Sequence, residues 1–480
     1  MSLPLPRIVS TDEAGTVLAT FVPSKQEKRD EKSNDGDVRI DVIRPPASAH
    51  TLLQSLLDVF LPSGYPHSVT PDYTPYQIYD SLQAFTSSIA GLLSSRAVLS
   101  TIGVGDSSAT PTLAILLSIL QESLGRITTI LFAHRLGTAL EPECKMYRLL
   151  ADVFNDAAMV LELLSPAFSR SVRVAVLATS SALKALCGVA AGSSKASLSK
   201  HFAKWGNLGE LNAKDSSQET VISLVGMVVG SGVVSYVEGQ RATWVCLLGL
   251  LGAHLWLNWM AVRSVTMRTL NRQRAGLVFA EWVEGGQVLG PEQVRVRERV
   301  FERDGVVRDV KGNVLGYCHV GVSFEEYLAR VGRSRRQGQY AFNVQQQVLD
   351  DIDGMGRGSE GSQRRYLLHL DANGRQCSIT LEKNCTVRDQ LQAWFTAYRA
   401  LQLLHLSEHG HLGNAESMTD RSKVHYGSAE MSNTSATLRN AQEYAEGMFP
   451  RLESRLEEAG WDLKTSALET RRGSRFARIG

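Results

Sequence analysis

Residues 242–262, ATWVCLLGLLGAHLWLNWMAV, are 21 consecutive positions without an Asp, Glu, Lys or Arg. A helix needs about 20 predominantly apolar residues to cross a bilayer. A soluble helix of this length rarely lacks a charged face, so the stretch predicts a transmembrane helix rather than a buried core helix. Trp244, Trp256 and Trp259 lie toward its ends, where amphipathic rings favour the membrane interface.

The preceding run, TVISLVGMVVGSGVVSYV at 220–237, is also uncharged, and only the residues EGQR separate the two runs. Together they predict a helical hairpin over 220–262. Gly226 and Gly230 have the GxxxG spacing that lets another helix pack closely. The hairpin is followed by a cluster of arginines, namely Arg263, Arg268, Arg272 and Arg274. The positive-inside rule places that end, and the chain beyond it, in the cytosol or its organellar equivalent.

Upstream, the segments 107–121, 127–140, 149–164 and 172–192 are apolar with charged interruptions. We expect them to complete a multi-helix membrane bundle, whose internal charges normally face a cavity or each other. The chain's formal net charge of +2 gives no electrostatic case for nucleic acid. The candidate substrate or ion site residues are Asp80, Arg96, Asp106, Thr110, Arg126, Asp152, Asn155, Asp156 and Lys184. Lys184 has no acid within a helical turn, so we expect its partner on another helix, with Asp106, Asp152 and Asp156 as candidates.

The stretch TIGVGDSSATP at 101–111 places Asp106 after two glycines. It lacks the strand and the Lys-Ser or Lys-Thr pair of a phosphate-binding loop. A GxGD-type intramembrane aspartyl protease would pair Asp106 with Asp80, which is a remote alternative because both motifs are short. We favour a break between or within spans, lined by Asp106 and Thr110, as in the discontinuous helices of transporters. Asp106 as an ordinary helix cap is the structural alternative.

AKDSSQET at 213–220 concentrates polar groups directly before the predicted hairpin. Capping of a helix N-terminus explains one or two of them. The remainder predicts a cytosolic-side gate or contact site, with the candidates Lys214, Asp215, Ser217, Gln218 and Glu219.

The two ends of the chain are more polar. Residues 24–39 predict a disordered charged insertion between two β-like runs. The run RYLLHLDANGRQCSITL at 365–381 predicts two strands around an Asn-Gly turn, and 386–406 has helical spacing. A closing helix is expected around 442–458. His405, His409 and His411 lack a metal partner at a convincing spacing, so we expect no metal and no cofactor.

The fold class expected is therefore mainly α, with a transmembrane bundle followed by a smaller α+β cytosolic domain. We divide the chain into an N-terminal segment, a membrane core and a C-terminal domain, at 1–48, 49–274 and 275–480.

Several long stretches resemble the root UVB sensitive family, among them KMYRLLADVFNDAAMVLELLSP at 145–166 and NAKDSSQETVISLVGMVVG at 212–230. The resemblance is continuous from about Leu57 to Arg274 and weaker beyond. It implies a membrane-associated protein of a family implicated in root UV-B responses and seedling development, with suggested links to auxin transport and vitamin B6 balance. It implies no established biochemical activity.

Transporter-like handling of a small solute is the function we favour, and a membrane scaffold recruiting partners through the C-terminal domain is the alternative. We expect no enzymatic activity. The expected partners are the lipid bilayer, an unidentified small-molecule ligand and another copy or family member, with no nucleic acid.

Overall fold

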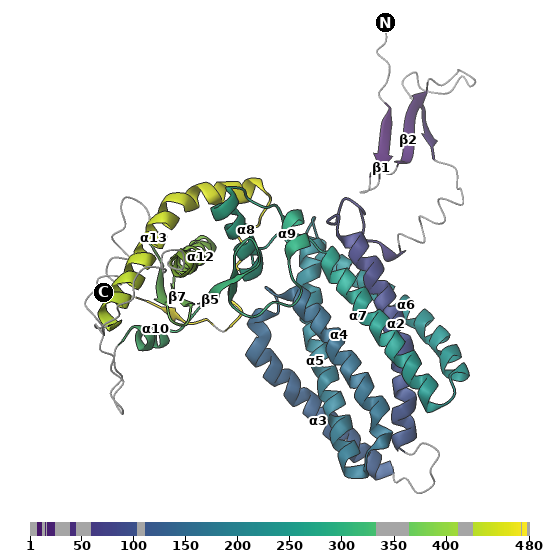
Figure 1. Ribbon diagram of the computed structural model, residues 1–480. Coiled ribbons are helices and arrows are strands. Elements are labelled where there is room, and N and C mark those ends of the chain that lie inside the picture. Colours follow the sequence, from purple (N-terminus) through teal and green to yellow (C-terminus); the bar gives the residue numbers. More distant parts are fainter. Residues whose placement is uncertain are drawn as a thin grey trace. The chain divides into compact units, whose positions relative to one another are not determined.

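A computed structural model describes residues 7–11, 15, 17–24, 39–44, 59–102, 111–332, 364–410, 426–471 and 473–477. The chain forms two compact units. The first comprises Met1–Arg96 and Ala196–Ala261, and the second Ala97–Lys195 and Val262–Gly480. The chain is mainly helical, as expected from its sequence (Figure 1).

The first unit begins with a three-stranded antiparallel sheet in the order β1-β2-β3. Its strands are β1 (Ile8–Thr11), β2 (Val17–Ser24) and β3 (Arg39–Ile43). The two β-like runs on either side of the charged insertion are thus confirmed as β2 and β3. The insertion itself falls on 25–38, outside the described residues.

Three long helices make up the rest of the first unit together with the end of α5. They are α2 (Tyr73–Ile102), α6 (Leu208–Tyr236) and α7 (Gln240–Ser264), the last extending a few residues into the second unit. The predicted hairpin is present as α6 and α7. Its first helix, however, begins at Leu208 rather than at Thr220, so the polar cluster at 213–220 lies inside α6 and does not cap it.

Helices α2 and α6 lie side by side and run parallel. Gln77 contacts Asp215, and Arg96 contacts Val234, each pair separated by 138 residues. Between these contacts the two backbones approach closely at Gly226, where an added Cβ would lie 2.8 Å from Ser88 Cβ and 3.1 Å from Phe85 O. Helix α7 is antiparallel to α2, because Arg96 contacts Thr243 and Gln83 contacts His254.

The long helices of the second unit that precede its α+β part are α3 (Pro111–Leu136), α4 (Cys144–Leu164) and most of α5 (Arg170–Phe202). Helices α3 and α5 are parallel neighbours. Ser181 Oγ donates to Gln121 O, and a Cβ on Gly125 would lie 3.5 Å from Ala185 Cβ, so both contacts join residues 60 positions apart. Helix α4 is antiparallel to α5: Ser180 contacts Glu162 near the end of α4, whereas Ala190 packs with Tyr147 and Ala151 near its start.

The α+β part of the second unit confirms the C-terminal prediction. Its sheet has the order β4-β5-β7-β6, with β8 also paired to β7. The strands are β4 (Val306–Arg308), β5 (Val314–Val320), β6 (Tyr366–Asp371), β7 (Gln376–Glu382) and β8 (Arg475–Phe476). The helices are α8 (Arg272–Gly285), α9 (Pro291–Arg297), α10 (Phe324–Val331), α12 (Val387–Gly410) and α13 (Tyr426–Glu458).

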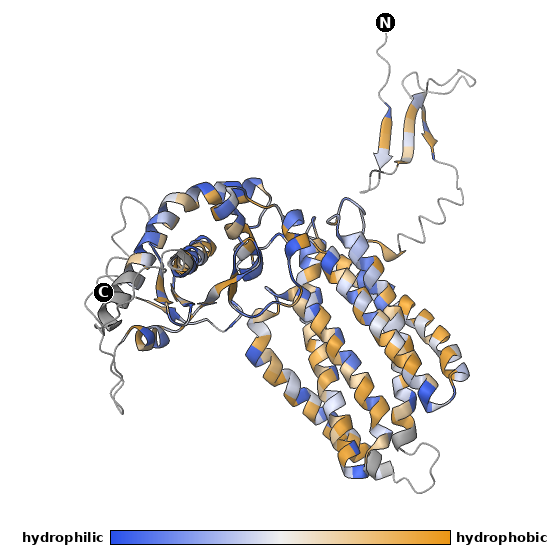
Figure 2. Cartoon of the chain, viewed as in Figure 1, coloured by the Kyte–Doolittle hydropathy of each residue, from blue (hydrophilic) through white to orange (hydrophobic). Residues whose placement is uncertain are grey.

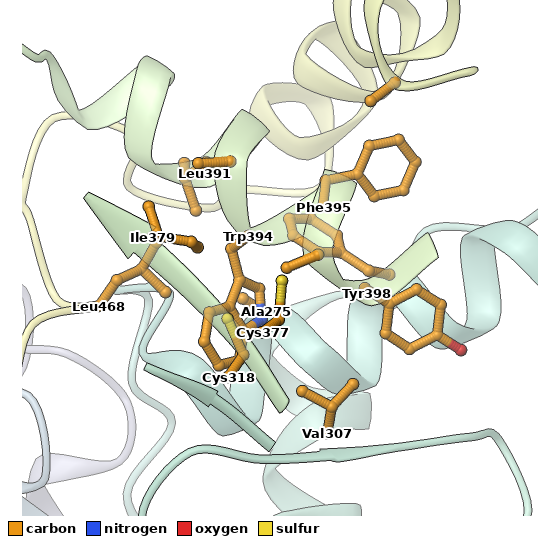
Figure 3. Packing of buried hydrophobic residues seen from close by; sticks show 14 of the residues in the cluster. Ala275, Val307, Cys318, Cys377, Ile379, Leu391, Trp394, Phe395, Tyr398 and Leu468 are labelled. Carbon is orange, nitrogen blue, oxygen red and sulfur yellow. The ribbon is translucent and has the colours of Figure 1, made fainter. Parts of the chain in front are cut away.

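β6 and β7 form the antiparallel hairpin expected around Asn373-Gly374, with Tyr366 opposite Leu381. Helix α12 lies against this sheet with its buried Trp394 close to Cys318 and Cys377 (Figure 3), whereas its Phe395 packs against Phe279 of α8 and Phe449 of α13. The cluster also includes Ala275 to Ala280 of α8, so α8 belongs to the C-terminal core.

Among the described residues, four helices are long and apolar enough to cross a membrane. They are Ile115–Ala139, Arg170–Phe202, Leu208–Tyr236 and Gln240–Ser264. Figure 2 shows hydrophobic residues along the length of these helices. Helices α2 and α4 do not meet the same criterion, because both carry many polar side chains.

Candidate functional site

A layer of buried polar side chains connects α2 and α7 in the first unit. The Asp80 carboxylate accepts hydrogen bonds from Gln83 Nε2 at 3.3 Å and from Tyr76 OH at 3.4 Å. Gln83 Oε1 lies 2.8 Å from His254 Nε2, and an amide oxygen can only accept, so His254 carries its proton on Nε2. Asn258, one helical turn beyond His254, is fully buried. We call Asp80, Gln83, His254 and Asn258 the polar layer.

Two further pairs of buried polar side chains lie near the start of α2. Gln77 Nε2 donates to Asp215 Oδ1 of α6 at 2.6 Å. Asp72 Oδ2 lies 2.9 Å from His201 Nε2 at the end of α5. The first half of α2 is therefore polar on the side that faces other helices, whereas its second half buries residues such as Ala90 and Leu93.

Of the predicted site residues, Asp80 and Asp215 belong to this buried polar region. Arg96 is half-buried and has a different environment. Its guanidinium donates to Val234 O at 2.9 Å, to Val237 O at 3.1 Å and to Thr243 Oγ1 at 2.8 Å. It thus satisfies carbonyls at the end of α6, whose last four carbonyls have no partner within the helix.

Lys214 and Gln218 bind the chain that precedes α2. Lys214 Nζ donates to Val59 O at 3.0 Å, and Gln218 Nε2 donates to Phe60 O at 2.6 Å. Ser217 and Glu219 are exposed. The five residues of the predicted gate therefore have three different environments. Asp215 is buried between helices, Lys214 and Gln218 contact the chain before α2, and Ser217 and Glu219 are exposed.

A second set of charges lies in α4 and α5. Arg148 pairs with Asp152 at 3.1 Å along α4, where Asp156 is also buried and Asn155 is half-buried. Lys184 forms an ion pair with Glu162, whose carboxylate lies 2.5 Å from Lys184 Nζ. Glu162 also accepts from Ser180 Oγ at 2.8 Å and was absent from the predicted partners, although its place in an apolar run could have identified it.

Arg126 pairs with Glu122 one helical turn away at 3.4 Å, and both side chains are mostly exposed. Asp106 and Thr110 lie outside the described residues. The predicted break in the helix and the Asp80–Asp106 pair therefore remain predictions.

A buried ion network that the sequence analysis missed lies where α4, α8 and α9 meet. Glu298 accepts from Lys145 at 2.5 Å and from Arg274 at 2.7 Å. Burial raises the pKa of the Glu298 carboxyl, but these two cations outweigh it and hold the pKa below its ordinary value. Arg272 pairs with Asp304 and, at 3.5 Å, with Glu143. Burial raises the pKa of Glu143 above its ordinary value despite Arg272 and Arg274.

This network revises the interpretation of the arginine cluster. Arg272 and Arg274 are buried in ion pairs, whereas Arg268 is exposed and Arg263 is half-buried. Two of the four charges used to orient the hairpin therefore stabilise the α+β domain. Arg272 and Arg274 directly precede the apolar run AGLVFA of α8.

The fold and these sites define a mainly helical protein with four apolar helices of membrane-spanning length, buried charges between helices and a C-terminal α+β domain. A family model described as "Vitamin B6 photo-protection and homoeostasis domain" matches residues 46–286. A second, described as "Root UVB sensitive protein, C-terminal", matches residues 344–471. The chain belongs to the root UVB sensitive family, which confirms the resemblance.

Similar curated proteins carry the family's name. Protein root UVB sensitive 3 of Arabidopsis thaliana is 32% identical over 354 residues, 73% of this chain and 76% of that protein. RUS family member 1 of Dictyostelium discoideum is 38% identical over 272 residues, 56% of this chain and only 52% of that protein. Protein root UVB sensitive 2, chloroplastic, of Arabidopsis thaliana is 29% identical over 72% of this chain and 73% of its own length. No solved structure matches the chain.

Proposed function

We propose that the helical region is embedded in a membrane and that the polar layer handles a small polar solute, as in a transporter. The main observation that supports this proposal is that α4 buries its charged side chains and exposes apolar ones. All of its charged side chains, Lys145, Arg148, Asp152, Asp156 and Glu162, are at most 7% exposed. The side chains on its exposed side are apolar apart from Asn155, and Val153 is the most exposed of its large apolar side chains. A helix in water shows the opposite pattern, and a helix in lipid turns its charges inward.

The outer faces of the other helices support the same environment. Ile115, Ile119 and Ile130 of α3 are more than half exposed, as are Leu224 and Val228 of α6. Apolar surface that continues along whole helices is rare on soluble monomers and marks contact with lipid or protein. The exposed Glu122–Arg126 pair interrupts this face, and its i,i+4 pairing reduces the cost of placing it there.

The helix directions indicate how many helices cross. Successive crossings of a membrane alternate in direction. If only the four apolar helices crossed, α3 and α5 would be consecutive crossings and would run in opposite directions. They are parallel neighbours, so α4 must cross between them.

The same argument extends to α2, which packs in parallel with α6 from Gln77 to Arg96. At about 1.5 Å per residue, this contact extends over roughly 30 Å, the thickness of the hydrocarbon core. Since α6 crosses, α2 occupies the same depth. Crossings that alternate along the chain require α7 to be antiparallel to α2 in the first unit and α4 to be antiparallel to α5 in the second, and both pairs are antiparallel.

Within such a bundle, the polar layer offers a carboxylate, two amides and an imidazole in a protein interior. Polar groups at membrane depth are costly and typically mark substrate or ion pathways. The hydrogen-bonding capacity of these groups suits a small, neutral or cationic, polar solute. The description of the matched family model makes vitamin B6 compounds the first solutes to test.

The test is uptake by proteoliposomes containing the full chain, with labelled pyridoxine and pyridoxal as solutes. Asp80→Asn and His254→Leu are expected to lower uptake at least tenfold while the protein remains inserted, because each removes a polar group of the layer. Glu122→Gln, which alters an exposed charge on α3, is the control and should retain uptake. Uptake at the level of protein-free liposomes for both solutes would contradict vitamin B6 transport and favour a scaffold role for the C-terminal domain.

A further inference from the structure

The C-terminal domain has a cavity of about 180 Å³ between the outer side of α8 and the β4–β5 turn. Its apolar lining includes Leu277 and Ala280 of α8 and Val306 of β4. Its charged lining consists of Arg272, Arg297, Arg299, Arg308 and Lys311 together with Glu281, Glu302 and Asp309. The lining thus carries a formal charge of +2 around an apolar floor.

Ion pairs formed by the lining residues show which of them carry the excess positive charge. Arg297 pairs with Glu281 at 2.7 Å, and Arg308 forms two hydrogen bonds with Glu302, at 2.8 and 3.0 Å. Arg272 is held by Asp304 and Glu143. These three arginines are therefore compensated within the fold.

Arg299, Lys311 and Asp309 remain, and Asp309 accepts hydrogen bonds from Asn313 N at 2.7 Å and from Asn313 Nδ2 at 2.8 Å, so these three groups leave a net charge of +1. Arg299 lies 4.0 Å from the already paired Glu302, and Lys311 has no ion-pair partner in the part of the chain that the structure describes. Arg299 Nη2 is 3.6 Å from the position that a Gly312 Cβ would take, so it lies against the turn that carries Lys311. Arg299, which shares Glu302 with Arg308, and Lys311 thus line the same cavity.

The cavity also reaches the backbone of α8. Gly276 lines it, and a Cβ added there would meet no atom within 4 Å. A side chain at this position would therefore project into open space and fill part of the cavity. The glycine leaves room for a ligand against the helix.

We propose that this cavity binds a small organic phosphate, with the phosphate at Arg299 and Lys311 and an apolar body on α8. A phosphate monoester carries about −1.5 to −2 charge at pH 7, which suits the two cations Arg299 and Lys311. A guanidinium binds phosphate oxygens in a fork, and a lysine ammonium adds a point charge. A monocarboxylate would supply only one negative charge for these two cations.

The proposal is tested by calorimetric titration of phenyl phosphate into the full chain in phosphatidylcholine nanodiscs, with benzoate as the singly charged comparison. Phenyl phosphate is expected to bind at least tenfold more tightly than benzoate. Arg299→Ala combined with Lys311→Ala should weaken binding about tenfold or more, because it removes the charge-assisted hydrogen bonds to the phosphate oxygens. Lys383→Ala combined with Arg455→Ala removes two exposed charges elsewhere in the domain and should leave the affinity within twofold.

Gly276→Leu is the second variant. It keeps every charge, favours helix formation and fills the cavity, so it should also weaken phenyl phosphate binding about tenfold or more. Equal losses in the two double variants would show non-specific electrostatic attraction and overturn the proposal. Unchanged affinity in Gly276→Leu would overturn it too, as would the absence of binding to the wild-type chain.

A phosphate could also belong to a lipid headgroup. Nanodiscs that contain phosphatidic acid distinguish the sources, because a headgroup in the cavity would weaken phenyl phosphate binding there. Unchanged affinity would identify a free organic phosphate. Whether the phosphate belongs to a lipid or to a free ligand, weaker binding by the Arg299→Ala and Lys311→Ala double variant is the result that decides the proposal.

Discussion

Single residues in this chain stabilise the fold through buried charge. Glu298 receives Lys145 from α4 and Arg274 from α8, and all three side chains are at most 7% exposed. Replacing a buried ion pair as a whole can be neutral, but removing one partner leaves the others uncompensated. Glu298 is therefore the residue whose loss the network should tolerate least.

We predict that Glu298→Gln destabilises the protein by about 3 kcal/mol near pH 7, because two buried cations lose their counter-charge. Chemical denaturation of the purified full chain measures the change. Glu292→Gln, which affects an exposed i,i+3 pair with Arg295, should change stability by less than about 1 kcal/mol.

The pH dependence of the same variant gives an independent check. The folded pKa of Glu298 is lowered, so its stabilising contribution is present above the ordinary carboxyl pKa of about 4.3 and is lost as the pH falls through the folded value. Glu143, with a raised pKa, acts in the opposite direction. The difference between wild type and Glu298→Gln should therefore shrink below about pH 4.3, and a constant difference would contradict the assigned pairing.

At the scale of elements, the α2–α6 contact depends on glycines that permit close backbone approach. The GxxxG spacing of Gly226 and Gly230 predicted a helix neighbour, and α2 occupies that position. The identity of the neighbour could not be predicted, because the spacing describes only one of the two surfaces. Gly232, on the same helix, would have no atom within 4 Å of an added Cβ.

We predict that Gly226→Leu lowers stability by about 1–3 kcal/mol, since its side chain would overlap Ser88 and the Phe85 carbonyl. Gly232→Leu is the matched control and should be neutral or slightly stabilising, because leucine favours the helix. The thermal unfolding midpoints of the two variants in detergent measure the contrast. Equal midpoints would show that α2 and α6 do not pack through Gly226.

At the scale of the whole molecule, the proposed embedding in a membrane implies that α4 also crosses, because α3 and α5 are parallel neighbours. Hydropathy alone selects four helices and omits α2 and α4. Both omitted helices carry their polar side chains toward other helices, so their average composition conceals an apolar outer face. Under the proposal, the number of crossings depends on helix packing as well as on hydropathy.

We predict that the turns at the two ends of α4 lie on opposite sides of the membrane. Glu141→Cys before α4 and Ser169→Cys after it introduce exposed thiols. In sealed vesicles, an impermeant maleimide should label them from opposite sides, measured against the wild-type background. Arg268→Cys, after α7, should label from the same side as Glu141→Cys, and labelling of Ser169→Cys from that side would exclude a crossing by α4.

The sequence by itself determined the family, the α6–α7 hairpin, the β6–β7 hairpin and helix α12, because each depends on periodicity, turn residues or uninterrupted hydropathy within one segment. It also selected Asp152, Asp156 and Lys184 as charges in apolar surroundings, and Asp80 as a possible partner of Asp106. Only the tertiary structure decided that Lys184 pairs with Glu162, that Arg96 binds the end of α6 and that Arg274 is buried beside Glu298. Hydropathy is a property of each residue alone. The interaction partner of a residue depends on which side of its helix packs against a segment distant in the sequence.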